Sequence, residues 1–186
     1  MAPYPHKEIE VLMRWSTCIL LLVGLAGPVG GQTAVGQSYR NVNGNFSVMM
    51  PADPHETVGD ETSGQVSHTI QAFAGSAGYT IIYVLTNADQ PVDEATYRIY
   101  RDGFMEALSN CDVATESAAS PAVPGYVGHG YRLNCVVAGK KMVIVGNLYW
   151  GKRYSYAVLV MFPAVLSEPA YTTKFLESFA VIDPGK

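Results

Sequence analysis

Three histidines beyond residue 31 are the side chains best suited to metal binding or acid–base chemistry. They are His55, His68 and His129. An imidazole binds transition metals and exchanges a proton near neutral pH. Metal-binding histidines often stand in a compact run or at i, i+4 spacing on a helix, and these three do neither. We therefore assign no metal site; if one exists, His68 and His129, expected on two strands, are its candidate ligands.

Two glycine-containing motifs lack the residues that their chemistry requires. A serine nucleophile elbow reads G-x-S-x-G and joins a strand to a helix. In AGSAG the first position is Ala74, and Ser76 joins two expected strands. A phosphate loop needs glycine where this chain has Asn134, and serine or threonine where it has Lys141. The sequence therefore predicts no catalytic residue and no cofactor, and we expect a protein that is not an enzyme.

Two cysteines, Cys111 and Cys135, remain beyond the first 31 residues. An even number of cysteines in an exported chain indicates a disulfide, and two separate buried thiols are the alternative. A bridge between them closes a loop of about 25 residues, for which a stabilisation of about 3 kcal/mol is expected.

The segment that begins at Met13, MRWSTCILLLVGLAGPVGGQ, has the pattern of a secretory signal. Arg14 supplies the positive start, Ile19–Leu25 the apolar centre, and small residues follow. The apolar run is shorter than the roughly 20 residues that span a bilayer. We interpret 1–31 as a signal peptide whose true start is Met13; a buried N-terminal helix is the alternative. We expect a secreted or periplasmic protein with no membrane anchor after cleavage.

The formal net charge of -4 argues against a nucleic-acid partner, which requires clustered basic residues. Two basic pairs, Lys140–Lys141 and Lys152–Arg153, are expected at opposite ends of one strand. A strand of about ten residues separates them by roughly 30 Å, so they do not form one patch.

Hydrophobic periodicity predicts strands and two helices in what remains, roughly 155 residues, the size of one domain. The last two long strands, 141–150 and 153–162, are apolar on both faces and must be covered on both sides. A helical period predicts helices over 89–111, with Asp89 as cap, and over 167–179. The other predicted strands are 46–50, 66–73, 79–86, 126–137 and a short one at 180–183.

The order of these elements predicts an α+β domain. We expect a mostly antiparallel β-sheet of about six or seven strands with helices packed on it, in an α/β/α sandwich-like arrangement. The predicted organisation is a flexible linker over 32–44, ending in an asparagine-rich turn, and a single domain over 45–183.

Tyrosine is abundant, and it fills both cores and interfaces because it combines apolar area with a polar tip. Most of these side chains are expected in the core. The predicted exposed binding patch lies around one turn and comprises Trp150, Lys152, Arg153, Tyr154 and Tyr156.

The chain resembles the PsbP-like superfamily in the order of its elements. The likeness covers Tyr39 to Ile182 and is carried by the opening strand FSVMMP, the central amphipathic helix, the hairpin GYRLNCVVAGKKMVIVGNLYWGKRYSYAVLV and the closing FLESFAVI. That superfamily includes extrinsic proteins of the photosynthetic oxygen-evolving complex, a nuclear Ran-binding factor and exported bacterial proteins. The resemblance implies an antiparallel sheet between helical layers and a non-enzymatic binding or assembly role. It carries no site residues over.

These observations predict an exported, non-enzymatic binding or assembly domain. Its expected partner is another envelope or secreted protein. The alternative is a small-molecule or metal binder, or an unfamiliar hydrolase, that uses His129 or His68.

Overall fold

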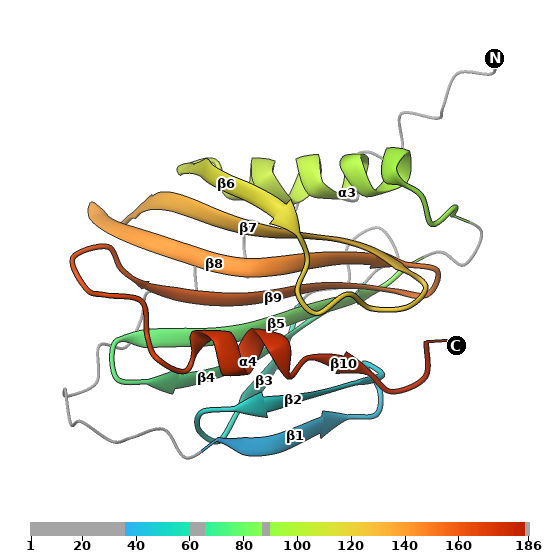
Figure 1. Cartoon of the computed structure of the whole chain (residues 1–186), viewed down its shortest axis with the longest axis horizontal. Coiled ribbons are helices and arrows are strands. Elements are labelled where there is room, and N and C mark those ends of the chain that lie inside the picture. Colours follow the sequence, from blue (N-terminus) through green and yellow to red (C-terminus); the bar gives the residue numbers. More distant parts are fainter. Residues whose placement is uncertain (1–35, 60–65, 87–89, 185–186) are drawn as a thin grey trace.

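The computed structural model describes residues 36–59, 66–86 and 90–184, and its largest element is a seven-stranded sheet (Figure 1). All neighbouring strands in this sheet run antiparallel. Their order across the sheet is β3 (His55–Val58), β4 (Ser67–Ala74), β5 (Ala77–Leu85), β9 (Tyr154–Pro163), β8 (Lys140–Gly151), β7 (Tyr126–Val137) and β6 (Cys111–Ala118). The predicted α+β fold on an antiparallel sheet is confirmed.

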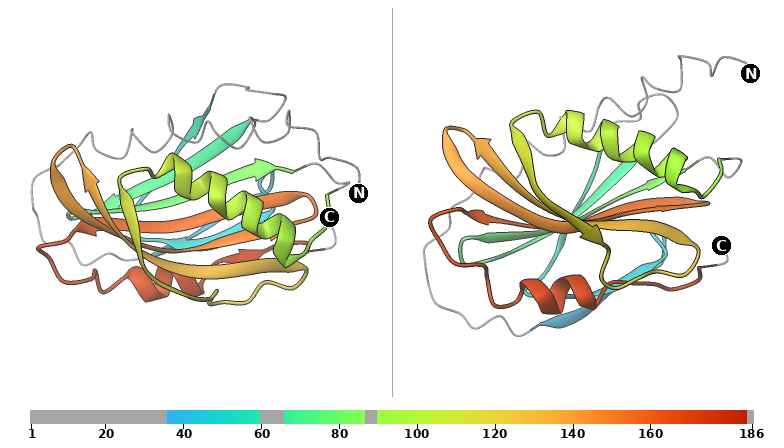
Figure 2. Two further views of the ribbon diagram at one scale, coloured as in Figure 1. Left: turned by 90° about the horizontal axis from the view of Figure 1, so that it is seen from above. Right: turned by 45° about the horizontal axis from the view of Figure 1, so that its top comes forward.

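A second, three-stranded sheet was not predicted as a separate unit. It contains β1 (Gln37–Asn41), β2 (Phe46–Met50) and β10 (Ala180–Val181), in the order β1-β2-β10. Two helices complete the described part of the chain, α3 (Glu94–Ala107) and α4 (Thr172–Glu177). Figure 2 shows α3 on one face of the large sheet, with α4 and the small sheet on the opposite face.

The central strands are buried on both faces, as their sequence predicts. Every residue of β9 before its last is buried. Tyr156 and Val158 belong to the core beneath α4 and the small sheet, whereas Ala157 and Leu159 belong to the core beneath α3. Because burial of one large apolar side chain stabilises a fold by about 1.5–3 kcal/mol, both covers are needed to keep this sheet out of water.

Helix α3 begins later than predicted. Its N-cap is Asp93 rather than Asp89, because the carboxylate of Asp93 accepts a hydrogen bond of 2.8 Å from the backbone N–H of Thr96. The same hydrogen bond lowers the pKa of Asp93 below its ordinary value. The helix ends at Ala107, well before Cys111, which belongs to β6. The helix buries one face, as its period predicts, and that face includes Tyr97, Tyr100 and Phe104.

Part of the predicted linker over 32–44 is a strand. Gln37–Asn41 pairs with β2, and the ring of Tyr39 packs 6.2 Å from that of Phe46. Backbone pairing holds this polar segment, which carries too few apolar residues to show a strand pattern. The folded domain therefore includes residue 37 and does not begin at 45. The predicted signal peptide, 1–31, lies outside the described residues.

Cys111 and Cys135 form a disulfide. The two residues are partners in the β6–β7 register, with Cα atoms 4.0 Å apart. The predicted bridge is confirmed, and the alternative of two separate thiols is wrong. The bond attaches the largely exposed edge strand β6 to the sheet.

Reduction should destabilise the domain by about 3 kcal/mol, because the bridge shortens the unfolded chain by closing a loop of about 25 residues. Urea unfolding with and without reductant measures this loss. The Cys111→Ala/Cys135→Ala variant should match the reduced protein and show no response to reductant. Equal unfolding midpoints for the oxidised and reduced wild type would contradict the expectation.

Alkaline pH should unfold the protein through its buried tyrosines. Burial raises the pKa of Tyr79 and of Tyr131 to about 12, and it also raises the pKa values of Tyr97 and Tyr156. An unfolded tyrosine ionises at about pH 10. The contribution of the buried tyrosines to the free energy of unfolding is therefore complete below that pH, and it is lost as the pH rises through their pKa values in the folded protein. The absorbance of tyrosinate and the far-ultraviolet circular dichroism should therefore change together above about pH 10. Full ionisation of all tyrosines with an intact fold would contradict this.

Candidate functional site

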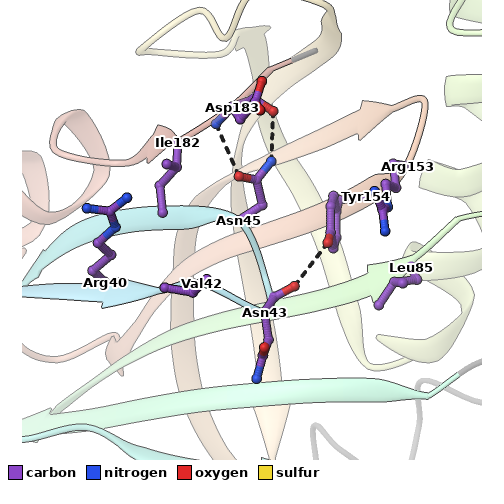
Figure 3. Close-up of a pocket in the computed structure, with 9 residues that line it drawn as sticks. All are labelled: Arg40, Val42, Asn43, Asn45, Leu85, Arg153, Tyr154, Ile182 and Asp183. Atoms are coloured by element: carbon purple, nitrogen blue, oxygen red, sulfur yellow. Dashed lines mark hydrogen bonds between the residues drawn. The ribbon is translucent and has the colours of Figure 1, made fainter. Parts of the chain in front are cut away.

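An open pocket of about 810 Å³ lies where four segments converge (Figure 3). These are the β1–β2 turn, the end of β5, the start of β9 and the residues after β10. The volume is within the range of about 300–1,000 Å³ typical of ligand sites. Its lining combines two arginines, two asparagines, apolar side chains, one tyrosine and one aspartate. We call it the two-arginine pocket, after Arg40 and Arg153.

The β1–β2 turn is built by its own asparagines. The side-chain oxygen of Asn41 accepts a hydrogen bond of 2.7 Å from the backbone N–H of Gly44. Asn45 adopts a left-handed φ of 57°, a conformation that asparagine tolerates better than most residues. A Cβ on Gly44 would lie 2.8 Å from the ring of Phe46 and 2.9 Å from that of Tyr83, so only glycine fits. The predicted turn is confirmed.

Asn45 also attaches the C-terminal segment to this turn. Its side-chain NH₂ donates to the carbonyl of Asp183 at 2.8 Å, and its side-chain oxygen accepts from the N–H of Asp183 at 3.1 Å. The backbone N–H of Ile182 donates to the carbonyl of Asn45 at 2.9 Å. Three hydrogen bonds thus fix one wall of the pocket.

Two tyrosines of β9 hold the same turn from the large sheet. The hydroxyl of Tyr154 donates to the carbonyl of Asn43 at 3.0 Å, and that of Tyr156 donates to the carbonyl of Gly44 at 2.8 Å. Burial raises the pKa of Tyr156 well above its ordinary value, so this hydroxyl remains a neutral donor. The turn that carries the pocket is therefore fixed to both sheets.

Arg40 and Arg153 are exposed, and neither belongs to an ion pair within the described ranges. Arg132, by contrast, pairs with Glu168 at 2.7 Å. The guanidinium of Arg153 lies 5.8 Å from the centroid of the Tyr154 ring, within cation–π range. The pocket thus carries two arginines that form no ion pair among the described residues, and one aspartate, Asp183, in a chain whose net charge is -4.

The predicted exposed aromatic patch is wrong for its three aromatic residues. Trp150, Tyr154 and Tyr156 are all buried, and only Lys152 and Arg153 of this set are exposed. The indole N–H of Trp150 donates to the carbonyl of Pro91 at 3.0 Å, so its polar group is satisfied inside the fold. Arg153 and Tyr154 do reach a concave surface, as lining residues of the two-arginine pocket. Sequence reasoning missed the contribution of Arg40.

His129 belongs to β7 and contacts side chains from helix α3 and strand β6. Its Nδ1 is 3.0 Å from the carboxylate of Glu116, its Nε2 is 3.2 Å from that of Glu94, and its ring stacks on Tyr97 at 4.6 Å. The hydroxyl of Tyr131 also donates to Glu116 at 3.0 Å. The two carboxylates engage opposite nitrogens of the imidazole, so they do not converge with it on one point.

His68 is on a different part of the sheet. Its Nδ1 is 3.1 Å from the carboxylate of Glu56, and its ring stacks on Tyr83 at 4.5 Å. Strands β4 and β7 are four positions apart in the sheet, which separates His68 from His129 by roughly 19 Å. The structure therefore does not bring these two candidate ligands together. His55 is exposed on the edge strand β3.

No set of three histidine, cysteine or acidic side chains in the described part of the chain is arranged to hold a metal ion. Within the same ranges, no helix is long and apolar enough to cross a membrane.

No family model and no curated protein matches this chain. Among solved structures, it is similar to a Pseudomonas aeruginosa protein of unknown function described as a putative regulator. The TM-score is 0.38 and the identity 8%, over 70% of this chain and 84% of the other. The resemblance to the PsbP-like superfamily stays a prediction.

Tyr97→Phe should destabilise the domain by about 1 kcal/mol, because it removes the buried hydrogen bond of 3.0 Å between the hydroxyls of Tyr97 and Tyr131. The matched control is Tyr171→Phe. The hydroxyl of Tyr171 is buried without a hydrogen-bond partner among the described residues, so its removal should be neutral or stabilising. Chemical unfolding of both variants tests this; equal losses would contradict it.

Proposed function

We propose that this chain is an exported, non-enzymatic domain that binds another envelope or secreted protein through the two-arginine pocket. The observation that carries the binding role is the pair of exposed arginines without ion-pair partners, Arg40 and Arg153, in a pocket whose walls are fixed by hydrogen bonds. Charged side chains that form no ion pair beside a fixed concave surface favour recognition of a complementary partner, because they steer its approach and set its orientation.

The disulfide supports the proposed compartment. Bonds such as Cys111–Cys135 persist in oxidising surroundings outside the cytoplasm and are rare within it. The signal pattern over 1–31 points the same way. Together they support a secreted or periplasmic location.

The lining chemistry favours binding over catalysis. Guanidinium, amide and apolar groups hold a ligand, whereas a reaction usually needs a positioned nucleophile or a proton-transfer group. The alternative, a small-molecule or metal binder or hydrolase, would use His129 or His68. His129 has both ring nitrogens in contact with carboxylates, so it has little capacity left for a substrate. We therefore favour the binding role.

A photo-crosslinking amino acid placed in the pocket should capture a recurrent partner in the native cells. Val42 and Leu85 suit this purpose, because they line the pocket and are 75% and 44% exposed. Ile99, 48% exposed on α3, is the matched control on the other face. We expect the same adduct from both pocket positions and not from Ile99. No adduct, or equal adducts from all three positions, would argue against the proposal.

Thiol trapping in fractionated cells should test the compartment separately. Protein in the envelope or medium should resist alkylation until reductant is added, because Cys111 and Cys135 are bonded. A chain found only in the cytoplasm with free thiols would contradict the proposed export. The crosslinking result would not be affected.

A further inference from the structure

The two-arginine pocket has a charge pattern that selects a particular kind of partner segment. Arg40 lies on β1 and Arg153 in the β8–β9 turn, and Figure 3 shows them at opposite ends of the lining set. Asp183 is the only acidic residue of that set. The lining therefore has an excess of one positive charge, opposite in sign to the chain as a whole. An anionic ligand is attracted to both ends.

Apolar groups share the lining with the two cations, and Figure 3 shows Val42 and Ile182 inward of Arg40 and Leu85 beside Arg153. Val42, Leu85 and Ile182 line the pocket together with the ring of Tyr154. Val42 and Leu85 are 75% and 44% exposed, and covering them would release water from apolar surface. A compact anion such as phosphate would touch one end and leave this surface wet. The surface fits a longer ligand with an apolar middle.

The neighbouring backbone favours a peptide as that ligand. Strand β1, which carries Arg40, is an edge strand of the small sheet, and no strand of the described residues pairs with its outer side. An edge strand presents unpaired N–H and C=O groups that an extended peptide can use. In such a peptide, side chains at i, i+2 and i+4 point the same way and repeat at about 6.8 Å, so two carboxylates can flank one apolar side chain on the face that meets the pocket.

Resting on the proposed binding role, we infer that the two-arginine pocket recognises an extended acidic segment of the partner protein, in which an apolar side chain at i+2 stands between carboxylates at i and i+4. The carboxylates contact Arg40 and Arg153, and the apolar side chain between them covers Val42. Guanidinium groups suit this role because they bind carboxylates in a bidentate manner.

Fluorescence anisotropy with a labelled Glu-Ser-Leu-Ser-Glu peptide, whose acidic and apolar side chains share one face when extended, tests the inference on the full disulfide-bonded chain. The comparison peptide is Gln-Ser-Leu-Ser-Gln, which has the same length and nearly the same shape. We expect the acidic peptide to bind about tenfold more tightly at low salt, and the difference to shrink as salt increases. Equal affinities for the two peptides, or no binding of the acidic one, would overturn the inference.

Substitutions assign the binding to this pocket. Arg40→Gln and Arg153→Gln should each weaken the acidic peptide by about fivefold and leave the neutral peptide unchanged, because each removes one exposed charge contact. Arg98→Gln is the matched control, since it removes the same charge from an exposed position on α3. Thermal melts confirm that each variant folds. If Arg98→Gln lost as much affinity for the acidic peptide as the two pocket variants, the effect would be one of general charge. That result would reject the pocket as the peptide site.

Competition with inorganic phosphate and with free acetate separates a peptide site from a small-anion site. We expect neither ion to displace more peptide than sodium chloride does at the same ionic strength. Displacement by phosphate beyond that control would overturn the peptide inference. Because the crosslinking test does not depend on the partner's charge, a partner captured at Val42 with no acidic preference would reject this inference and retain the proposed function.

Discussion

Three central strands that are apolar on both faces impose the main constraint on this fold. Strands β5, β8 and β9 lie side by side in the middle of the large sheet, and water must be kept from both of their surfaces. Helix α3 covers one surface, while α4 and the small sheet cover the other. The small sheet is therefore a structural requirement as well as a source of pocket-lining residues, because it completes the second cover.

The pocket is a consequence of how that second cover is attached. Tyr154 and Tyr156 project from β9 and bind carbonyl groups of the β1–β2 turn, which in turn holds Asp183 through Asn45. The hydrogen bonds at this junction hold the two sheets in a fixed position relative to each other where apolar packing ends. The hollow that remains is bordered by chain ends and turns, where charged side chains such as Arg40 are not needed for packing.

The large sheet and the disulfide follow from the sequence because their signals are local: alternating apolar residues, and the cysteines Cys111 and Cys135. Strands β1, β3 and β6 were missed, since all three are largely polar and are stabilised by pairing with neighbours. Alternation predicts the two faces of a strand but not which aromatic side chains become fully buried. Trp150 was therefore predicted to be exposed, although it is buried. The pocket escaped prediction because segments distant in sequence supply it, and no pattern relates Arg40 to Arg153.

The attachment of the C-terminal segment has a practical consequence for anyone who produces this protein. Asp183 is held in the lining of the two-arginine pocket by Asn45. In the proposed binding role, acidic residues of a tag added close behind Asp183 would be held at high effective concentration beside Arg40 and Arg153 and would compete with the partner. A purification tag at this end should therefore be removable or free of acidic residues.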